Sequence, residues 1–188
     1  QAPRAAKPAS LTALAADPVA WRGVEAEFVM QFGSELESYH WWATRFNPSD
    51  YLGFSAWGDE QWLWEERAFS APRTRLFVRR GTTAATVLAG TPLYRRFQVR
   101  AVVRTIFEGE PWIEILSATP LDRSLGQGSL LHATNAFVYL KDGQLDAARV
   151  QFDRALAAPM PAAMRQALEV AQQGLAGGQA WALHLTGV

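Results

Sequence analysis

The sequence predicts an α+β fold in two parts, a five-stranded Greek-key barrel followed by a helical hairpin with a capping helix. Apolar and polar residues alternate in the first two-thirds of the 188 residues, with turn-forming residues between the runs. In the last third, apolar residues recur at helical spacing, with glycine and proline near the expected helix ends. The 49% hydrophobic and 19% charged residues are typical of a folded domain with a core.

Five strands are predicted from the alternation. Residues 24–32 and 96–107 alternate most clearly, and a Glu108-Gly109-Glu110-Pro111 turn leads to a return strand at 112–117. Shorter strands are expected at 51–57 and 75–80, while residues 39–46 are either a strand or a loop. A short helix over 11–16, with Ser10 as its N-cap, precedes them. We therefore expect a flexible segment over residues 1–10, a barrel over 11–122, and a helical region with a short tail over 123–188.

The first strand of this barrel and its closing hairpin resemble a known family. An acidic residue and a proline form a turn, and an aromatic residue, a glycine and an apolar strand follow. The residues concerned are Ala16-Asp17-Pro18 and Trp21-Arg22-Gly23-Val24. They resemble the first strand of bacterial anticodon-binding-like domains of the oligonucleotide/oligosaccharide-binding (OB) fold, and residues 97–115 resemble the closing hairpin. The resemblance covers about residues 11–120 and implies an OB-type barrel, although the long insertion at 35–71 departs from the shortest members.

Residues 129–160 resemble a single tetratricopeptide repeat. Small, aromatic and glycine residues stand at the matching positions, which are Ala136, Tyr139, Gly143, Ala148, Phe152 and Ala155. His132 and Asn135 depart from the pattern, and Pro159 and Pro161 flank the expected proline. Solenoids usually need at least about three repeats. We therefore expect the helix that starts at residue 161 to cover one face, and the other face to pack on the barrel or on another molecule.

The net charge is zero, but its distribution is uneven. Nine arginines and no acidic residue lie between residues 67 and 107. Strand alternation places Arg96, Arg100 and Arg104 on one face, and OB barrels bind single strands through a basic groove with exposed aromatic residues. Alternatively, Glu25 and Glu27 on the neighbouring strand pair with Arg100 and Arg104, which would make these arginines structural.

The sequence offers little for catalysis. Cysteine is absent, the three histidines lie far apart, and there is no glycine-rich phosphate loop or Gly-x-Ser-x-Gly motif. The acidic cluster of Glu108, Glu110 and Glu114 is typical of a solvated turn. We expect no enzyme activity, no cofactor and no metal site.

These features predict a non-enzymatic adaptor or structural subunit that binds protein partners in a bacterial envelope assembly. Tryptophan, tyrosine and arginine dominate interface hot spots. The predicted protein contacts are Trp41, Trp42, Trp62, Trp64, Tyr139 and Trp181. The alternative is binding of single-stranded nucleic acid or a glycan by the barrel. The predicted contacts for that alternative are Arg75, Arg79, Arg96, Arg100 and Arg104.

The start of the chain suggests a location. It begins Gln1-Ala2-Pro3-Arg4, and its first ten residues are rich in alanine and proline. We interpret this as a mature terminus after signal-peptide removal, which predicts a periplasmic or extracellular protein; a domain boundary is the alternative. No run of 18 apolar residues occurs, so no transmembrane segment is expected.

Overall fold

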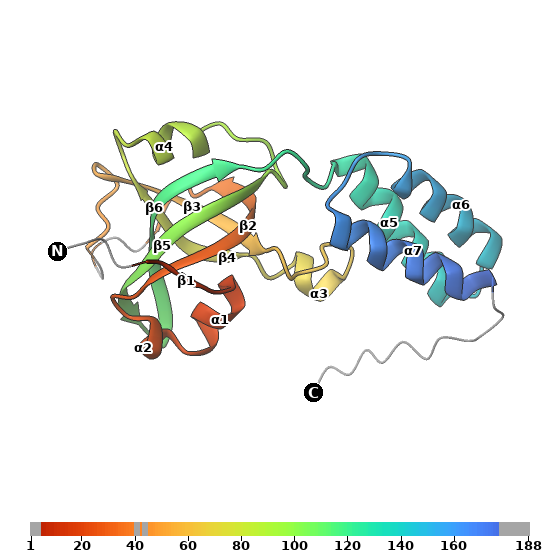
Figure 1. Cartoon of the computed structure of the whole chain (residues 1–188), viewed down its shortest axis with the longest axis horizontal. Helices are drawn as coiled ribbons and strands as arrows, with labels where there is room; N and C mark the ends of the chain where they lie inside the picture. The colour runs from red at the N-terminus through yellow and green to blue at the C-terminus, as the bar shows by residue number, and fades with distance from the viewer. Residues whose placement is uncertain (1–4, 40–41, 43–44, 177–188) are drawn as a thin grey trace. The chain divides into compact units, whose positions relative to one another are not determined.

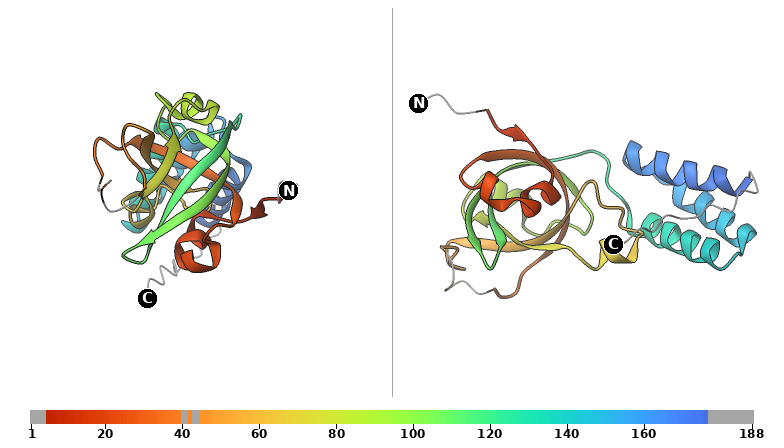
Figure 2. Two further views of the ribbon diagram at one scale, coloured as in Figure 1. Left: turned by 90° about the vertical axis from the view of Figure 1, so that its left-hand side faces the viewer. Right: turned by 90° about the horizontal axis from the view of Figure 1, so that it is seen from below.

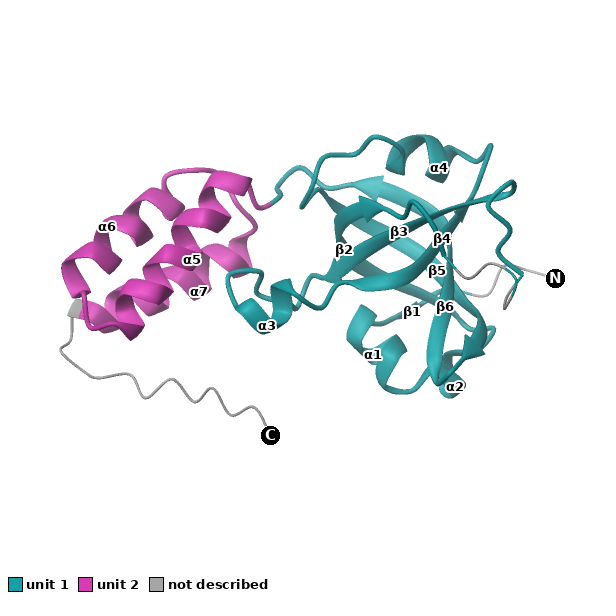
Figure 3. Ribbon diagram, turned by 180° about the vertical axis from the view of Figure 1, so that it is seen from behind, with its two compact units in different colours: residues 1–124 teal, residues 125–188 magenta. Residues whose placement is uncertain are grey.

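The computed structural model describes residues 5–39, 42 and 45–176, and the chain divides into two compact units, Gln1–Ser124 and Leu125–Val188 (Figure 3). The described elements of the first unit are β1 (Lys7–Pro8), α1 (Leu11–Ala16), α2 (Pro18–Trp21), β2 (Glu25–Glu35), β3 (Tyr51–Gly58), α3 (Glu66–Phe69), β4 (Arg73–Arg79), α4 (Thr83–Leu88), β5 (Arg96–Phe107) and β6 (Glu110–Pro120). Those of the second unit are α5 (Gln127–Lys141), α6 (Leu145–Leu156) and α7 (Ala162–Ala176). The unit boundary lies two residues after the predicted one.

Five strands of the first unit close into a barrel (Figure 1). Around the ring the order is β2, β3, β4, β6 and β5, and β5 pairs again with β2. The pairing of β4 with β6 is parallel and spans Leu76↔Ile113 to Val78↔Ile115, while the other pairs in the ring are antiparallel. The predicted α+β architecture, a five-stranded barrel followed by a helical region, is confirmed.

The sequence did not predict the strand at Lys7–Pro8 or the helix after β4, and it left residues 39–46 open between a strand and a loop. Lys7–Pro8, in the segment predicted to be flexible, forms β1 and pairs in parallel with Ala26 and Glu27 of β2. The described residues between 39 and 46 contain no strand. The segment 81–90, which has no clear period, contains α4, whose N-cap Thr82 accepts a hydrogen bond from the Ala85 amide. A two-residue strand and a six-residue helix are too short to produce a periodic pattern.

Helices close both ends of the barrel over its core. Viewed along the barrel (Figure 2, right), the strands form a ring and α1 lies across the near end, while α4 lies at the opposite end (Figure 1). Leu11 and Leu14 of α1 and Leu88 of α4 are buried in the same core as the inward residues of the strands. Ser10 caps α1 as predicted, because its hydroxyl accepts a hydrogen bond from the Ala13 amide at 3.0 Å.

The second unit is a helical hairpin with a third helix. The small side chains of Ala136 and Ala148 are fully buried, which is the condition for close approach of two helices. Phe137 on α5 and Phe152 on α6 pack edge to face at 5.3 Å between ring centroids. On α7, Arg165 donates hydrogen bonds at 3.0 Å to the carbonyl of Leu156, the last residue of α6, and to that of Ala158 just after it, so its charge lies at the negative end of that helix.

The hairpin between β5 and β6 yields the first prediction. Its two turn residues, Glu108 and Gly109, have φ of 52° and 78°, which is the type I′ arrangement. Asparagine tolerates the left-handed conformation better than glutamate does. We expect Glu108→Asn to raise the free energy of unfolding by about 0.5 kcal/mol, measured by urea unfolding with tryptophan fluorescence. The control Gly109→Ala should lower it by about 1 kcal/mol. A loss of stability in Glu108→Asn would contradict the turn assignment.

Candidate functional site

The arginines predicted to bind a ligand are largely engaged within the barrel. Arg96 makes a two-pronged contact with Asp59, with Nε and Nη2 each 2.6 Å from a carboxylate oxygen. The two side chains are only 13% and 29% exposed. Bidentate arginine–carboxylate pairs are among the stronger polar contacts in proteins. Arg96 therefore fixes the segment that follows β3 to the outside of β5.

The next two arginines along β5 are also paired. Arg100 contacts Glu25 of β2 at 2.5 Å, one of the pairings predicted from the sequence. Arg104 donates instead to Glu114 of β6 at 2.5 Å, so it pairs with neither of the two glutamates considered from the sequence. The reason is register: the pairing of β2 with β5 reaches only Val102, and Arg104 lies beyond it. Glu27 accepts a hydrogen bond from Gln98.

The two remaining candidate arginines lie on β4. Arg75 donates to the Phe107 carbonyl at 3.2 Å, and its guanidinium lies 5.7 Å from the centre of the Trp112 ring. Arg79 is exposed, opposite Tyr51 of β3. Four of the five candidate arginines therefore have internal partners. Such pairing lowers the positive charge available for phosphate groups, on which nucleic-acid affinity largely depends.

An aromatic cluster occupies the outer face of β3, β4 and β6. We call it the outer cluster; its buried members are Phe46, Phe77 and Trp112, and Tyr39 and Tyr51 pack against them. Phe46 stacks on Phe77 with 4.2 Å between ring centroids, and Phe77 stacks on Trp112 at 5.1 Å. A Cβ at Gly53 would lie 3.0 Å from the Tyr39 ring, so the ring rests directly over this backbone. A base or sugar ring could stack on Phe77 only after displacing Phe46.

Glu114 connects the outer cluster to the arginine pairs. It is a buried carboxylate that accepts from Arg104 on one oxygen and from the Tyr51 hydroxyl, at 3.4 Å, on the other. Burial raises the pKa of Tyr51, and the negative charge of Glu114 raises it further. Burial also raises the pKa values of Tyr39 and Tyr94. Sequence reasoning missed Phe46 and Glu114 as structural residues, because the first lies in a turn-like segment and the second in an acidic cluster.

The aromatic residues predicted to contact a protein partner come from separate segments. Trp42 is exposed, and a half-buried Trp62 stacks on the buried Trp64 at 5.2 Å with nearly parallel rings. Tyr139 is half-buried on α5 of the second unit. Trp41 and Trp181 lie outside the described residues. Since Trp64 is buried, only Trp62 of this pair is accessible to a partner.

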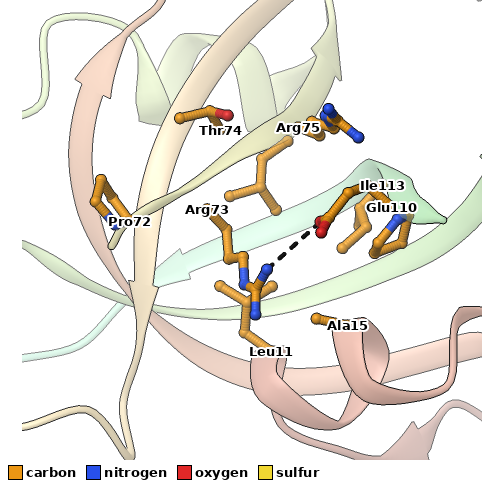
Figure 4. Close-up of a pocket in the computed structure, with 10 residues that line it drawn as sticks. Leu11, Ala15, Pro72, Arg73, Thr74, Arg75, Glu110 and Ile113 are labelled. Carbon is orange, nitrogen blue, oxygen red and sulfur yellow. Dashed lines mark hydrogen bonds and ion pairs between the residues drawn. The ribbon is translucent and has the colours of Figure 1, made fainter. Parts of the chain in front are cut away.

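The cavities of the barrel unit are small. One, of about 200 Å³, lies between α1, the start of β4 and the β5–β6 hairpin (Figure 4). Arg73 and Glu110 face each other across it at 3.4 Å, and Leu11 and Ile113 also line it. A second cleft, of about 380 Å³, lies beside β3 and is lined by Tyr39, Trp42 and others. The first is smaller than pockets for drug-sized ligands, which usually measure about 300–1,000 Å³, and the second is near the lower end of that range.

Neither a candidate metal site nor a candidate membrane-spanning helix is found in the described part of the chain. No group of three or more His, Cys, Asp or Glu side chains there could hold a metal ion. Among the helices described, none is long and apolar enough to cross a membrane.

Comparison with known proteins gave no match. No protein-family model, no curated protein and no solved structure is significantly similar to this chain.

The arginine pairs should differ in their contribution to stability. Arg96→Gln leaves the carboxylate of Asp59, which is largely shielded from water, without its partner, so we expect a loss of about 2 kcal/mol in the free energy of unfolding. Arg100→Gln is the control: Arg100 and Glu25 are 44% and 37% exposed, and the loss should stay below about 1 kcal/mol. Urea unfolding measures both. Equal losses would show that the Arg96 contact adds nothing beyond a surface pair.

The burial of the tyrosines predicts that the free energy of unfolding depends on pH in the alkaline range. Since burial raises the pKa of Tyr39 above its ordinary value of 10.0, the unfolded chain loses this proton first as the pH rises. The contribution of Tyr39 to the free energy of unfolding should therefore be constant below about pH 9 and fall as the pH passes about 10. Tyr39→Phe should make this fall less steep, measured by urea unfolding between about pH 8 and 11. An unchanged slope would show that the Tyr39 hydroxyl stays accessible to water.

Proposed function

We propose that this protein is a non-enzymatic adaptor or structural subunit that binds a protein partner through its helical unit. The observation that supports this is the exposure of large apolar side chains on all three helices. They are Leu131, Val138, Leu145, Val150 and Val170. Exposed apolar side chains mark a protein interface where they form a continuous patch. The two surfaces of the barrel that resemble ligand sites are engaged with its own side chains.

We infer further that the barrel is an OB-type Greek key. Strands β2, β3 and β4 form a meander, and β5 returns to pair with β2, which gives the spatial order β5-β2-β3-β4. This order of three consecutive strands and a fourth beside the first defines a Greek key. Strand β6 then closes the ring between β5 and β4. A barrel of five strands with this connection supports the OB assignment.

The helical unit is proposed to be a single tetratricopeptide-like repeat. The buried small residues Ala136, Ala148 and Ala155, the buried Phe152 and the left-handed Gly143 agree with the pattern of that repeat. Since one repeat buries few of its surfaces, a partner is the natural source of further contacts. A location in the bacterial envelope stays a prediction.

Single-stranded nucleic-acid or glycan binding remains the alternative proposal. Arg96, Arg100 and Arg104 are paired with acidic side chains. The positive charge left for a nucleic acid is therefore smaller than the sequence alone indicated. The outer cluster also weakens this alternative, because its aromatic rings already stack on each other and leave few ring faces for a base or a sugar.

Affinity purification with matched variants tests the adaptor proposal. The tagged protein is recovered from its own cells after mild cross-linking, with and without nuclease, and co-purifying proteins are quantified by mass spectrometry. We expect a fixed set of proteins in both samples. Val150→Glu on α6 should reduce that set by about tenfold or more, since it places a charge in an apolar contact. Val19→Glu on α2 makes the same change at an exposed valine of the barrel unit and should leave the set intact.

Two results would contradict the adaptor proposal. Disappearance of the associated material after nuclease treatment would favour the arginine-bearing strands as a nucleic-acid surface. Equal recovery with Val150→Glu and Val19→Glu would exclude this face of α6 as the contact.

A further inference from the structure

The cleft beside β3 combines aromatic and charged side chains. It measures about 380 Å³, and its lining includes Tyr39, Trp42 and Tyr51 together with charged residues of both signs. Trp42 is 69% exposed, while Tyr39 and Tyr51 are half-buried against the outer cluster. A concave surface with aromatic walls and a few polar groups is the usual form of a small-ligand site.

Three arginines without ion pairs lie at one end of this cleft. Arg80 lines the cleft, and its Nε donates to the Pro48 carbonyl at 2.8 Å, while among the described residues no acceptor contacts its two Nη groups. Arg79 lies directly opposite Tyr51 in the pairing of β3 with β4. No ion pair in the described part of the chain includes Arg45, Arg79 or Arg80. Their charges are therefore available to a ligand.

The tyrosines of the cleft report how close these arginines are. Burial raises the pKa of Tyr51, while the charges of Arg79 and Arg45 lower it. Burial also raises the pKa of Tyr39, and the charge of Arg80 lowers it. Electrostatic effects of this kind weaken with distance. The three arginines therefore lie near two aromatic residues that line the cleft.

The other end of the cleft is acidic. Glu35 and Glu37 line it, and Oε1 of Glu35 accepts a hydrogen bond from the Gly90 amide at 3.2 Å. Glu35 pairs with Phe54 of β3, three residues beyond Tyr51, which corresponds to about 10 Å along the strand. The cleft therefore has a positive end and a negative end.

We propose that this cleft binds an acidic sugar of a glycan, a six-membered ring that carries one carboxylate. The sugar carboxylate would accept paired hydrogen bonds from the Nη groups of Arg80, a geometry that suits arginine. The carboxylates of Glu35 and Glu37 would accept hydrogen bonds from ring hydroxyls. The ring C–H groups would pack on the face of Trp42, since the edge of a C–H group is positive and the aromatic face is negative.

A buried hydroxyl in the lining of the cleft lacks a partner. The Tyr39 hydroxyl is buried and forms no hydrogen bond in the structure. Buried polar groups are nearly always hydrogen-bonded, so this hydroxyl is expected to gain a partner. Because Tyr39 lines the cleft, a bound sugar or a water that it holds would supply one.

A single-stranded nucleic acid fits this cleft less well. Its phosphates recur at every nucleotide, and binding relies on a basic groove that follows the backbone. Glu35 and Glu37 would face a second phosphate and repel it. A ligand with a single anionic group avoids this repulsion. The site goes beyond the proposed adaptor function, because it lies on the barrel and involves no residue of the helical unit.

Isothermal titration calorimetry of the full chain with matched probes tests the ligand class. The probes are a tetrasaccharide that contains glucuronic acid, a neutral tetrasaccharide of glucose, and a single-stranded oligothymidylate. We expect the acidic tetrasaccharide to bind with a Kd of about 1 mM or below, at least about tenfold more tightly than the neutral one. Absence of binding at about 10 mM, or equal binding of the neutral sugar, would overturn the proposal. Tighter binding of the oligothymidylate would also overturn it and would favour nucleic acid.

Matched arginine variants locate the site. Arg80→Gln should weaken binding of the acidic tetrasaccharide by about tenfold or more. Arg67→Gln makes the same change at an exposed arginine of α3 and should leave binding unchanged. Because Arg80 also holds Pro48, Arg79→Gln is a second variant and should weaken binding by about threefold. Wild-type affinity in both cleft variants would exclude this end of the cleft as the site.

The variant Glu37→Gln separates an acidic sugar from a phosphate chain. An amide accepts weaker hydrogen bonds than a carboxylate, so binding of the acidic tetrasaccharide should fall. Repulsion between Glu37 and the sugar carboxylate is screened at about 0.15 M salt across the length of the cleft. For a phosphate chain the same change removes a nearby repulsion, so binding should rise. Stronger sugar binding by Glu37→Gln would contradict the role of the negative end, and this result leaves the adaptor proposal untouched.

Discussion

The barrel depends on the pairing of β2 with two different strands. One edge of β2 pairs with β5 from Glu25↔Val102 to Gln31↔Arg96, and the other edge pairs with β3 from Met30 onward. On that second edge, β1 pairs with β2 before β3 begins. A shift of one residue would exchange the inner and outer faces of the strand. This register therefore places Phe28 and Met30 in the core and also determines which acidic residues lie beside the arginines of β5.

The outer surface of the barrel follows from the same register. Outward positions on β5 carry arginine, and acidic partners come from β2, from β6 and from the residue after β3. Outward positions on β4 and β6 carry Phe77 and Trp112, which Phe46 covers from the preceding segment. The charged and aromatic side chains from which the sequence predicted a binding surface thus hold the segments around Phe46 and Asp59 against the barrel. The barrel consequently has an inner core and a smaller outer one.

Sequence reasoning recovered the features that have a local signal. Alternation over twelve residues gave β5, and the α1 cap could be predicted from Ser10, because both signals lie within a few residues of the structure they produce. The missed features depend on distant residues. The partner of Arg104 depends on where β2 begins, and Phe46 becomes buried only because β3, β4 and β6 present a flat aromatic face. Of the predicted contacts of the helical unit, Tyr139 lies on α5, but only the structure shows that Leu131 and Val138 of this helix are exposed.

The two units differ in how far their side chains are paired with each other. In the barrel, most candidate binding groups already have partners. In the helical unit, α5 has neither a side-chain cap at its N-terminus nor oppositely charged pairs along its length. Isolated helices of about 12–15 residues are marginal in water, so α5 must gain its stability from packing. Helix α6 supplies that packing on one side only, and the opposite side of α5 exposes Leu131 and Val138.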